Sequence, residues 1–272
     1  MARKSRAKQN SYASSDFDTK QNRRSNRNNR NNPSKKRSKE SAEIVELNAH
    51  IQHVDTAYSP WQDKSPLKPR NAAQKRYISA IKNNMLTFGI GPAGTGKSYC
   101  AGALAADALE SGAIERIILT RPAVEAGENL GFLPGDLDEK FAAYIDAFRD
   151  ILNERLGAGT VNYCLRHGRI VAAPLAYMRG KTFKEDTFVI LDEAQNTSPE
   201  QMKMFLTRIG DDCRVVVNGD IKQSDIRGAN GLADAVERLA GLPRVHIHEF
   251  EREDIVRSGL VRDVIDRYEV ED

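Results

Sequence analysis

The stretch GPAGTGKS, residues 91–98, decides how the rest of the chain is interpreted. It has three glycines within six positions, and Lys97 and Ser98 follow directly. Glycine adopts positive φ without steric cost, so a loop of this kind can turn several backbone N–H groups toward one ligand. The pattern G-x-x-x-x-G-K-[ST] requires a strand before it and a helix after it. Both are expected here, at residues 85–90 and 97–110, so the stretch predicts a phosphate-binding loop rather than a chance glycine-rich turn.

The residue types of this loop suit a nucleoside triphosphate. The positive end of the helix dipole and the Lys97 side chain can neutralise the β- and γ-phosphates, and the Ser98 hydroxyl can bind Mg²⁺. ATP and Mg²⁺ are therefore the predicted ligands. The residues expected to contact the nucleotide are Gly91, Pro92, Ala93, Gly94, Thr95, Gly96, Lys97 and Ser98.

Two polar segments follow later strands. TFVILDEAQNT (187–197) is an apolar strand that ends in Asp192 and Glu193. Ligands of parallel sheets bind at the carboxyl edge, so Asp192 is predicted to hold Mg²⁺ and Glu193 to polarise an attacking water as a general base. VVVNGDIKQSD (215–225) places Gln223 where an amide can sense the γ-phosphate, although a polar turn has the same composition.

A weaker candidate precedes the loop, in NAAQKRYISAI. The Gln74 amide can both donate to and accept from the N6 and N7 edge of adenine. Tyr77, one helical turn further on, can stack on the base. Core packing is the favoured interpretation for Tyr77, because aromatic residues at helical spacing usually face the interior.

Helical and strand patterns alternate from residue 71 onward, which predicts an α/β fold with a parallel sheet and helices on both faces. Apolar residues from Leu137 to Leu156 recur at helical spacing, with Gly157 as a stop. Ser198 opens a capping box with proline at the first helical position. The strands are expected at residues 85–90, 114–119, 169–173, 187–191, 214–218 and 245–250, and further helices at 71–82, 97–110, 198–208, 231–240 and 260–270.

Charge divides the chain into a basic beginning and a mildly acidic remainder. Residues 1–40 contain 13 Lys and Arg against 3 acidic residues and lack Leu, Ile, Val and Trp, whereas residues 41–272 contain 28 against 35. We expect 1–40 to be disordered, because so few apolar groups cannot offset chain entropy, and to be either an arm for RNA or DNA or a solubilising tail. Residues 41–65 are expected to hold a short ordered segment and a linker, and residues 66–272 the folded domain.

Cysteines and apolar runs restrict the cellular setting. Cys100, Cys164 and Cys213 are far apart, odd in number and without metal-ligand spacing, which favours reduced thiols. No apolar run is long enough to cross a bilayer, and the N-terminus lacks an apolar signal region. The sequence predicts a cytoplasmic protein with no membrane partner.

Together the motifs resemble the PhoH family. The resemblance covers residues 66–272 and rests on GPAGTGKS, ILTRPAVEAGENLGFLPGDLDEK, APLAYMRGKTF, VILDEAQNTSPEQMKMFLTRIG, VVVNGDIKQSDI and EREDIVRSGLV. That family is similar to the motor core of superfamily 1 helicases, with DEAQ as motif II and GDIKQ as motif III. The resemblance implies a RecA-like P-loop ATPase domain, Mg²⁺-ATP, single-stranded RNA or DNA, and a homo-oligomer in the form of a hexameric ring.

The same resemblance has two wider implications. The family name suggests phosphate starvation, although no residue of this chain reports it. A compact domain with a basic arm also suits a bacteriophage member of the family, which would act in the host cytoplasm.

A single RecA-like domain is expected to lack the arginines that a second domain supplies in helicases. The resemblance therefore implies an arginine from a neighbouring subunit, which would stabilise the transition-state charge. The candidates are Arg208, Arg257 and Arg179, each of which can equally be a surface or ion-paired residue. RPAVEAGENLGFLPGD (121–136) follows the second strand, where related motors contact nucleic acid, and Thr120 and Arg121 are candidates to bind its phosphates.

Three functions are compatible with these features. The favoured one is an ATPase that moves on or remodels RNA or DNA. The alternative is a nucleotide-gated oligomeric scaffold or regulatory binding protein with little turnover, since no second motor domain is visible. A small-molecule kinase ranks last, because Asp192, Glu193 and the Gly219-Asp220 pair suit water activation better than binding of an acceptor.

Overall fold

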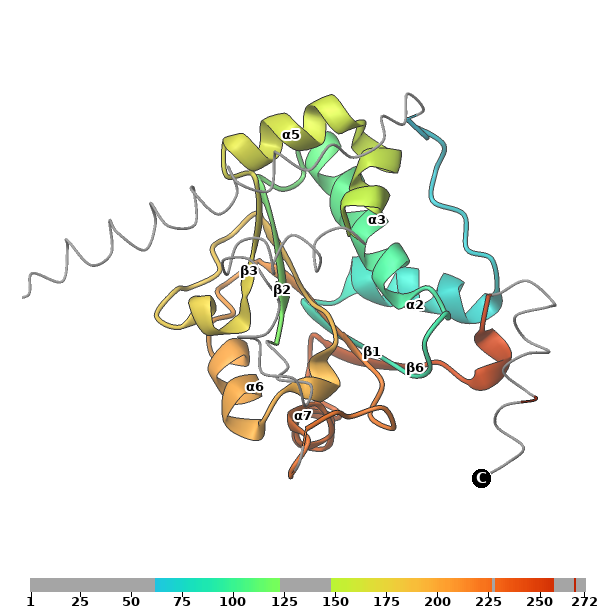
Figure 1. Ribbon diagram of the computed structural model, residues 1–272, viewed down its shortest axis with the longest axis vertical. Helices are drawn as coiled ribbons and strands as arrows, with labels where there is room; N and C mark the ends of the chain where they lie inside the picture. Colours follow the sequence, from blue (N-terminus) through green and yellow to red (C-terminus); the bar gives the residue numbers. More distant parts are fainter. Residues whose placement is uncertain (1–61, 123–147, 227, 257–266, 268–272) are drawn as a thin grey trace, which may run out of the picture.

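A six-stranded sheet forms the centre of the domain (Figure 1). The computed structural model describes residues 62–122, 148–226, 228–256 and 267. Every strand pair is parallel, and the order across the sheet is β3-β2-β4-β5-β1-β6. The strands are β1 (Leu86–Ile90), β2 (Arg116–Arg121), β3 (Ile170–Pro174), β4 (Thr187–Leu191), β5 (Arg214–Gly219) and β6 (Val245–Glu249).

Helices cover both faces of the sheet. One apolar cluster joins the sheet to α2, α3, the helix at residues 148–156 and α5, and a second cluster joins it to α6 and α7. The α-helices are α2 (Ala72–Asn83), α3 (Lys97–Glu110), α5 (Ala158–Arg166), α6 (Pro199–Leu206) and α7 (Gly231–Leu239). Short 3₁₀ turns are η3 (Leu175–Met178), η4 (Ala194–Asn196) and η5 (Arg252–Asp254).

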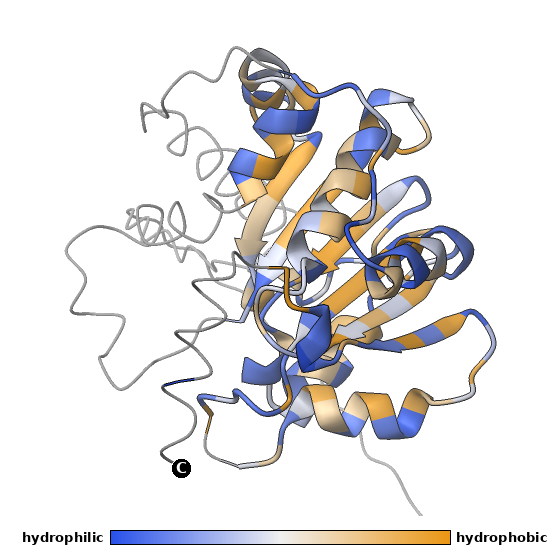
Figure 2. Cartoon of the chain, turned by 90° about the vertical axis from the view of Figure 1, so that its right-hand side faces the viewer, coloured by the Kyte–Doolittle hydropathy of each residue, from blue (hydrophilic) through white to orange (hydrophobic). Residues whose placement is uncertain are grey.

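Alternate residues of the central strands β2, β4 and β5 supply the two clusters, as the two-residue period of a strand requires. In β4, Phe188 and Ile190 pack with α2 and α3, whereas Val189 and Leu191 pack with α6 and α7. All five residues of β4 are buried, because a parallel sheet covered on both sides leaves no strand face to water. Figure 2 shows the central strands as mainly hydrophobic, with hydrophilic residues on the helices around them.

The strand order brings the predicted motifs to one edge. β5 lies between β1, which leads into loop 91–98, and β4, which ends before Asp192. Ile90 is in register with Gly219, so the loop and the later polar segment leave the sheet side by side. The predicted α/β class is confirmed: an all-parallel sheet lies between two layers of helices, and loop 91–98 follows β1 at its carboxyl edge.

Helix α5 was not predicted from the sequence. Gly157, with φ of 80°, does stop the preceding helix as expected, but it also precedes α5 directly. The α5 segment has no side-chain N-cap and buries only Val161, Cys164 and Leu165, so it lacks both the start signal and a long apolar stripe. Packing beside β3 therefore stabilises a helix that its local sequence does not predict.

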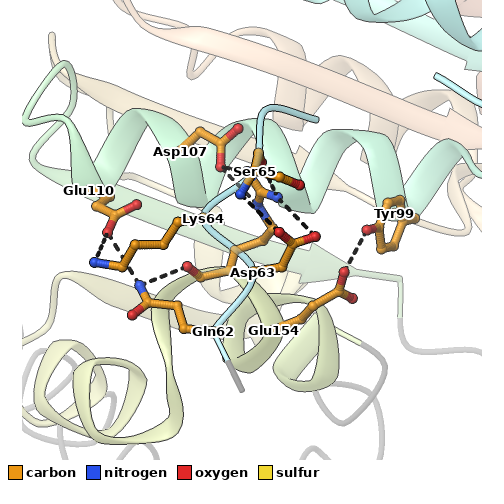
Figure 3. A network of polar contacts seen from close by, with 9 residues as sticks. Gln62, Asp63, Lys64, Ser65, Tyr99, Asp107, Glu110 and Glu154 are labelled. Carbon is orange, nitrogen blue, oxygen red and sulfur yellow. Dashed lines mark hydrogen bonds and ion pairs between the residues drawn. The ribbon is translucent and has the colours of Figure 1, made fainter. Parts of the chain in front are cut away.

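A polar network holds residues 62–65 against the helical layer (Figure 3). Arg155 donates to Asp107 Oδ1 through Nε and Nη2, at 2.9 and 2.7 Å, and through Nη1 to the Ser65 carbonyl at 2.8 Å. Gln62 donates to the Arg155 carbonyl at 3.0 Å, and the Asp63 N–H donates to the Glu154 carbonyl at 2.7 Å. The part of the predicted linker that the structure describes is thus bound to α3 and to the helix at 148–156.

Several sequence predictions concern residues outside the described ranges. They include the tail at 1–40, most of segment 41–65, the helical pattern before residue 148 and the helix at 260–270. Among the described residues no helix has the length and apolar character needed to cross a membrane. Cys100, Cys164 and Cys213 are free and buried, and burial raises the pKa of the Cys100 thiol to about 12.

Candidate nucleotide site

The loop after β1 has the backbone that its glycines predict. Gly91, Gly94 and Gly96 have φ of 135°, 83° and 89°. A Cβ on Gly91 would lie 2.3 Å from the Phe250 carbonyl oxygen, and one on Gly96 would lie 2.5 Å from Gln74 Nε2. These positions therefore need glycine both for the left-handed backbone and for the close approach of neighbouring groups.

Neighbouring elements hold the loop in place. Gln74 Nε2 donates to the Thr95 carbonyl at 2.9 Å, and the Val256 N–H donates to the Gly94 carbonyl at 2.9 Å. Asn71 caps α2 and also donates to the Asp254 carbonyl at 2.9 Å. The segment after β6 and the start of α2 therefore hold the loop in place together. This role of Asn71 and Val256 was not predicted from the sequence.

The predicted adenine contact of Gln74 stays a prediction. Its amide oxygen accepts the Arg70 N–H at 2.9 Å, and its nitrogen donates to Thr95, which leaves one N–H and one lone pair for a base. Tyr77 is fully buried and donates to Asn218 Oδ1 at 2.5 Å. The core interpretation of Tyr77 is confirmed.

Lys97 occupies the centre of the loop. Its Nζ donates to the carbonyls of Gly91 and Pro92 at 2.6 and 2.8 Å. Burial lowers the pKa of Lys97, while the nearby carboxylates of Asp220, Asp192 and Glu193 raise it. These bonds keep the ammonium inside the loop, where a phosphate can replace the two carbonyls as the acceptor.

Ser98 and Asp192 are brought together as predicted for a metal site. The Ser98 hydroxyl donates to Asp192 Oδ1 at 2.8 Å, and the Asp192 N–H donates to the Thr120 carbonyl at 3.0 Å. Mg²⁺ prefers oxygen ligands and usually combines one or two protein groups with phosphate and water. A hydroxyl and a carboxylate oxygen in contact therefore fit Mg²⁺ together with a bound nucleotide, although the metal roles of both residues stay predictions.

Glu193 is held by its neighbours beside the loop. Its backbone has φ of 54°, in the left-handed region that few side chains adopt. Gln195 Nε2 donates to Glu193 Oε2 at 2.7 Å, and Gln195 Oε1 accepts the Asp220 N–H at 3.1 Å. A Cβ on Gly219 would lie 2.7 Å from Gln195 Oε1, so the glycine there makes room for this bridge. Gln195 belongs to the DEAQ motif but was not predicted as a site residue.

Groups of the loop and of both acidic segments line one pocket of about 280 Å³. Gln223 lines it, as the sequence predicts, and its N–H donates to the Asp220 carbonyl at 3.0 Å. The described residues that line it are Ala93, Gly94, Gly96, Lys97, Ser98, Tyr99, Asp192, Glu193, Gln195, Gly219, Asp220 and Gln223. The loop and both acidic segments therefore share one hollow at the carboxyl edge of the sheet.

Of the three candidate arginines, Arg179 and Arg208 are described, and neither lines this pocket in its own subunit. Arg208 follows α6, and its carbonyl accepts the Phe183 N–H at 2.8 Å. Since α6 starts near the carboxyl edge and the chain then enters β5 at the opposite edge, Arg208 lies away from loop 91–98. Arg179 is exposed after η3, and Arg257 lies outside the described residues. The role of any of them in a neighbouring subunit stays a prediction.

The two residues at the end of β2 that were predicted to bind nucleic-acid phosphates are not freely exposed. Thr120 is 3 % exposed, so it cannot reach a nucleic-acid phosphate without a rearrangement. Arg121 turns into the nucleotide site and pairs with Asp192 Oδ2 through Nη2 at 2.5 Å. The sequence placed Arg121 correctly at the carboxyl edge, but the pairing depends on the adjacency of β2 and β4, which no local pattern shows.

The sequence is similar to PhoH-like proteins of bacteria. The sequence profile of the family described as PhoH-like protein matches residues 66–269. The PhoH-like protein of Bacillus subtilis (strain 168) is 50% identical over 205 residues, which are 75% of this chain and 64% of that protein. Protein PhoH of Escherichia coli (strain K12) is 50% identical over 211 residues, 76% of this chain and 59% of that protein. The chain thus spans less than two thirds of the length of these curated relatives.

Solved structures give a looser likeness. The UvsW helicase from bacteriophage T4 superposes with a TM-score of 0.43 and 11% identity, over 75% of this chain and 66% of that one. The Pif1 helicase from Candida albicans superposes with a TM-score of 0.39 and 14% identity, over 74% of this chain and 43% of that one. By its sequence match over most of the described domain, the chain belongs to the PhoH-like protein family.

Proposed function

We propose that this protein is a Mg²⁺-dependent ATPase that couples hydrolysis to the binding, translocation or unwinding of RNA or DNA. One observation carries the proposal: Ser98 of the loop contacts Asp192 at 2.8 Å, while Gln195 holds Glu193 at the same pocket. A kinase would need a site for an acceptor, whereas this arrangement presents a carboxylate that can take a proton from water.

The chain's own residues suggest how the reaction proceeds. Glu193 accepts a proton from water as the water oxygen forms its bond to the γ-phosphorus, and the bond from that phosphorus to the β–γ bridging oxygen breaks. ADP leaves with the electron pair of the broken bond, and Lys97 stabilises the resulting negative charge. Bound Mg²⁺ would supply further charge neutralisation at the phosphates. Gln223, also at this pocket, is the proposed sensor of the γ-phosphate.

The charge of the pocket supports a metal and an additional arginine. Its described lining contains three carboxylates, from Asp192, Glu193 and Asp220, against the single ammonium of Lys97. A triphosphate adds more negative charge, so cations from outside this lining are needed to stabilise the transition state. We infer that Mg²⁺ supplies one and that a neighbouring subunit of a homo-oligomer, proposed as a hexameric ring, supplies an arginine such as Arg208 or Arg257.

Nucleic acid is the proposed partner, and the cytoplasm the proposed compartment. Residues 1–40 carry 13 Lys and Arg against 3 acidic residues, which suits binding to a phosphate backbone through counterion release. Arg121 adds a cation at the carboxyl edge of the sheet, next to the nucleotide site. These features support single-stranded RNA or DNA rather than a small molecule as the ligand that hydrolysis acts on.

The proposal is tested by ATP hydrolysis with and without single-stranded RNA and single-stranded DNA. Stimulation by one polymer, with Glu193→Gln as the blank, is the expected result and identifies the track. Turnover that neither polymer changes would overturn the nucleic-acid coupling. No turnover, with nucleotide-dependent assembly, would instead favour the oligomeric scaffold.

A further inference from the structure

The metal-site carboxylate already has a cation of its own. Asp192 Oδ2 is 2.5 Å from Arg121 Nη2, and the two side chains are 3% and 18% exposed. Its other oxygen, Oδ1, accepts the Ser98 hydroxyl at 2.8 Å. Both oxygens of the carboxylate are therefore engaged by groups of the protein.

A divalent cation and a guanidinium make competing demands on one carboxylate. Each gains most of its stabilisation from the same negative charge, and in a buried setting their mutual repulsion is weakly screened. The Ser98 contact is compatible with a metal because the hydroxyl oxygen can itself be a ligand. The Arg121 contact is not compatible with a metal in the same way, since a guanidinium has no acceptor atom that could be a metal ligand.

Arg121 is also free to leave more easily than most buried arginines. Among the described residues, its Nε has no hydrogen-bond partner, and the guanidinium donates to Asp192 through Nη2. Its Cζ lies 5.8 Å from the centre of the Phe148 ring, on the helix at 148–156. An arginine held by one carboxylate and an aromatic face can exchange partners without breaking a wider network.

We propose that Arg121 is a resident counter-cation that Mg²⁺-nucleotide displaces from Asp192, and that the displaced guanidinium then binds a phosphate of single-stranded nucleic acid. The second half rests on the proposed function. Because β2 ends at Arg121, the exchange takes place at the carboxyl edge, where ligands of parallel sheets bind. One side chain thereby couples the two ligands. When nucleic acid binds Arg121, Asp192 is free to bind Mg²⁺ more tightly, and by linkage bound Mg²⁺ raises the affinity for nucleic acid by the same factor.

The first arm of the test measures the Mg²⁺ dependence of ADP binding by calorimetry on the full chain, without nucleic acid. Arg121→Gln is expected to lower the half-saturating Mg²⁺ concentration by about tenfold, because the competing charge is gone. Arg121→Lys keeps the charge and is expected to stay close to the wild type, whereas Arg121→Met, which keeps the aliphatic stem without the charge, repeats the test if the Gln variant is poorly folded. A half-saturating concentration that stays unchanged or rises in Arg121→Gln would overturn the competition and make Arg121 a helper of the metal site.

Arg155→Gln is a matched control. Arg155 is likewise a mostly buried arginine paired with an aspartate, Asp107, at 2.7 Å, but it is not among the described residues that line the nucleotide pocket. Its substitution is expected to lower the melting temperature without changing the Mg²⁺ dependence. A similar change in both variants would show that loss of stability, rather than loss of the competing cation, lowers the Mg²⁺ requirement, and this would overturn the proposal.

The second arm adds oligouridine or oligothymidine to the same titration. In the wild type the oligonucleotide is expected to lower the half-saturating Mg²⁺ concentration, and in Arg121→Gln this effect is expected to disappear. An equal effect in both proteins would overturn the coupling through Arg121. If the oligonucleotides bind neither protein, the proposed nucleic-acid function and the coupling fail together, whereas the first arm still decides whether Arg121 competes with the metal.

Discussion

Gln195 connects two acidic segments that are separate in the sequence. Its amide donates to Glu193 Oε2 at 2.7 Å and accepts the Asp220 N–H at 3.1 Å. The amide thereby sets the direction of the Glu193 carboxylate, whose backbone is already in the left-handed region. Under the proposed function Glu193 is the general base, and a base must be aimed at its water, so this contact gives Gln195 a positioning role.

Gln195→Ala should lower kcat for ATP hydrolysis by about tenfold while leaving the affinity for ATP near the wild-type value, because the loop that binds the phosphates is unchanged. Steady-state phosphate release and ATP calorimetry measure the two quantities. Gln195→Glu has a similar size but places a like charge against Glu193, and it should lower kcat further. A loss of ATP affinity equal to the loss of kcat would contradict a positioning role.

His248 is a second residue whose environment has a measurable consequence. It is 6% exposed, and its ring lies 5.4 Å from Tyr77 and 4.6 Å from Phe250 between centroids. Burial is the main cause that lowers the pKa of His248; the neighbouring charges of His246 and Arg76 lower it further, while Asp254 and a backbone hydrogen bond with Ala73 oppose them. The folded state therefore favours the neutral ring.

The sign of the pH effect follows from this lowered pKa. Below the ordinary value of 6.5 the unfolded chain takes up a proton that the folded chain resists, so the free energy of unfolding falls as the pH drops from 6.5 through the folded-state pKa. His248→Phe should flatten this part of the stability profile, measured by urea unfolding between neutral and mildly acidic pH. The same substitution at the exposed His167 controls for the loss of a histidine. An unchanged slope in His248→Phe would show that other groups cause the acid sensitivity.

At the scale of elements, Arg155 joins several parts of the helical layer. Arg155 joins the helix at 148–156 to Asp107 of α3 and to the Ser65 carbonyl (Figure 3). Its side chain is 6% exposed, whereas that of Asp107 is 34% exposed, so water can partly stabilise the aspartate if the arginine is lost. The pair is therefore worth less than a fully buried one.

Arg155→Met keeps the aliphatic stem but removes every polar contact of the guanidinium. We expect the free energy of unfolding to fall by about 2 kcal/mol, which is below the range for breaking a fully buried pair because Asp107 is partly solvated. Arg238→Met removes an exposed pair with Asp234 and should change stability by less than about 0.5 kcal/mol. Equal effects of the two substitutions, measured by chemical denaturation, would contradict the conclusion that Arg155 stabilises the helical layer.

Elements with strong local signals could be predicted from the sequence, and those that depend on tertiary packing could not. The buried run Thr187–Leu191 and the helix Lys97–Glu110 have their expected bounds, because apolar composition and the glycine-rich start are local features. Helix α5 was not predicted because its stripe of buried residues is short. The pairing of Arg121 with Asp192 and the bond from Val256 to the loop join residues far apart in the chain, and only the strand order brings them together.

At the scale of the whole molecule, charge separates the basic beginning of the chain from the acidic domain. Residues 1–40 carry a net charge of about +10, from 13 basic and 3 acidic residues. If that segment binds the backbone of a single strand, each neutralised phosphate contributes about 0.7 to the slope of log affinity against log salt. If it is only a solubiliser, its removal leaves that dependence unchanged.

Deletion of residues 1–40 should leave the melting temperature unchanged within about 2 °C, since the described domain makes its own core. The slope of log affinity for single-stranded nucleic acid against log salt should become clearly flatter. Fluorescence anisotropy with a labelled oligonucleotide at several salt concentrations measures the slope. An unchanged slope would assign the segment a solubilising role and leave nucleic-acid binding to the domain.

The most direct test of the ATPase itself is ATP turnover and ATP binding in Glu193→Gln, measured beside the wild type and Lys97→Ala. Glu193→Gln should bind Mg²⁺-ATP with near wild-type affinity and release phosphate at least about 100-fold more slowly, because an amide cannot accept the proton from water. Lys97→Ala should lose turnover altogether, because the phosphate charge has lost its partner. Normal hydrolysis by Glu193→Gln would contradict the assignment of Glu193 as the base and, with it, the proposed chemistry of the site.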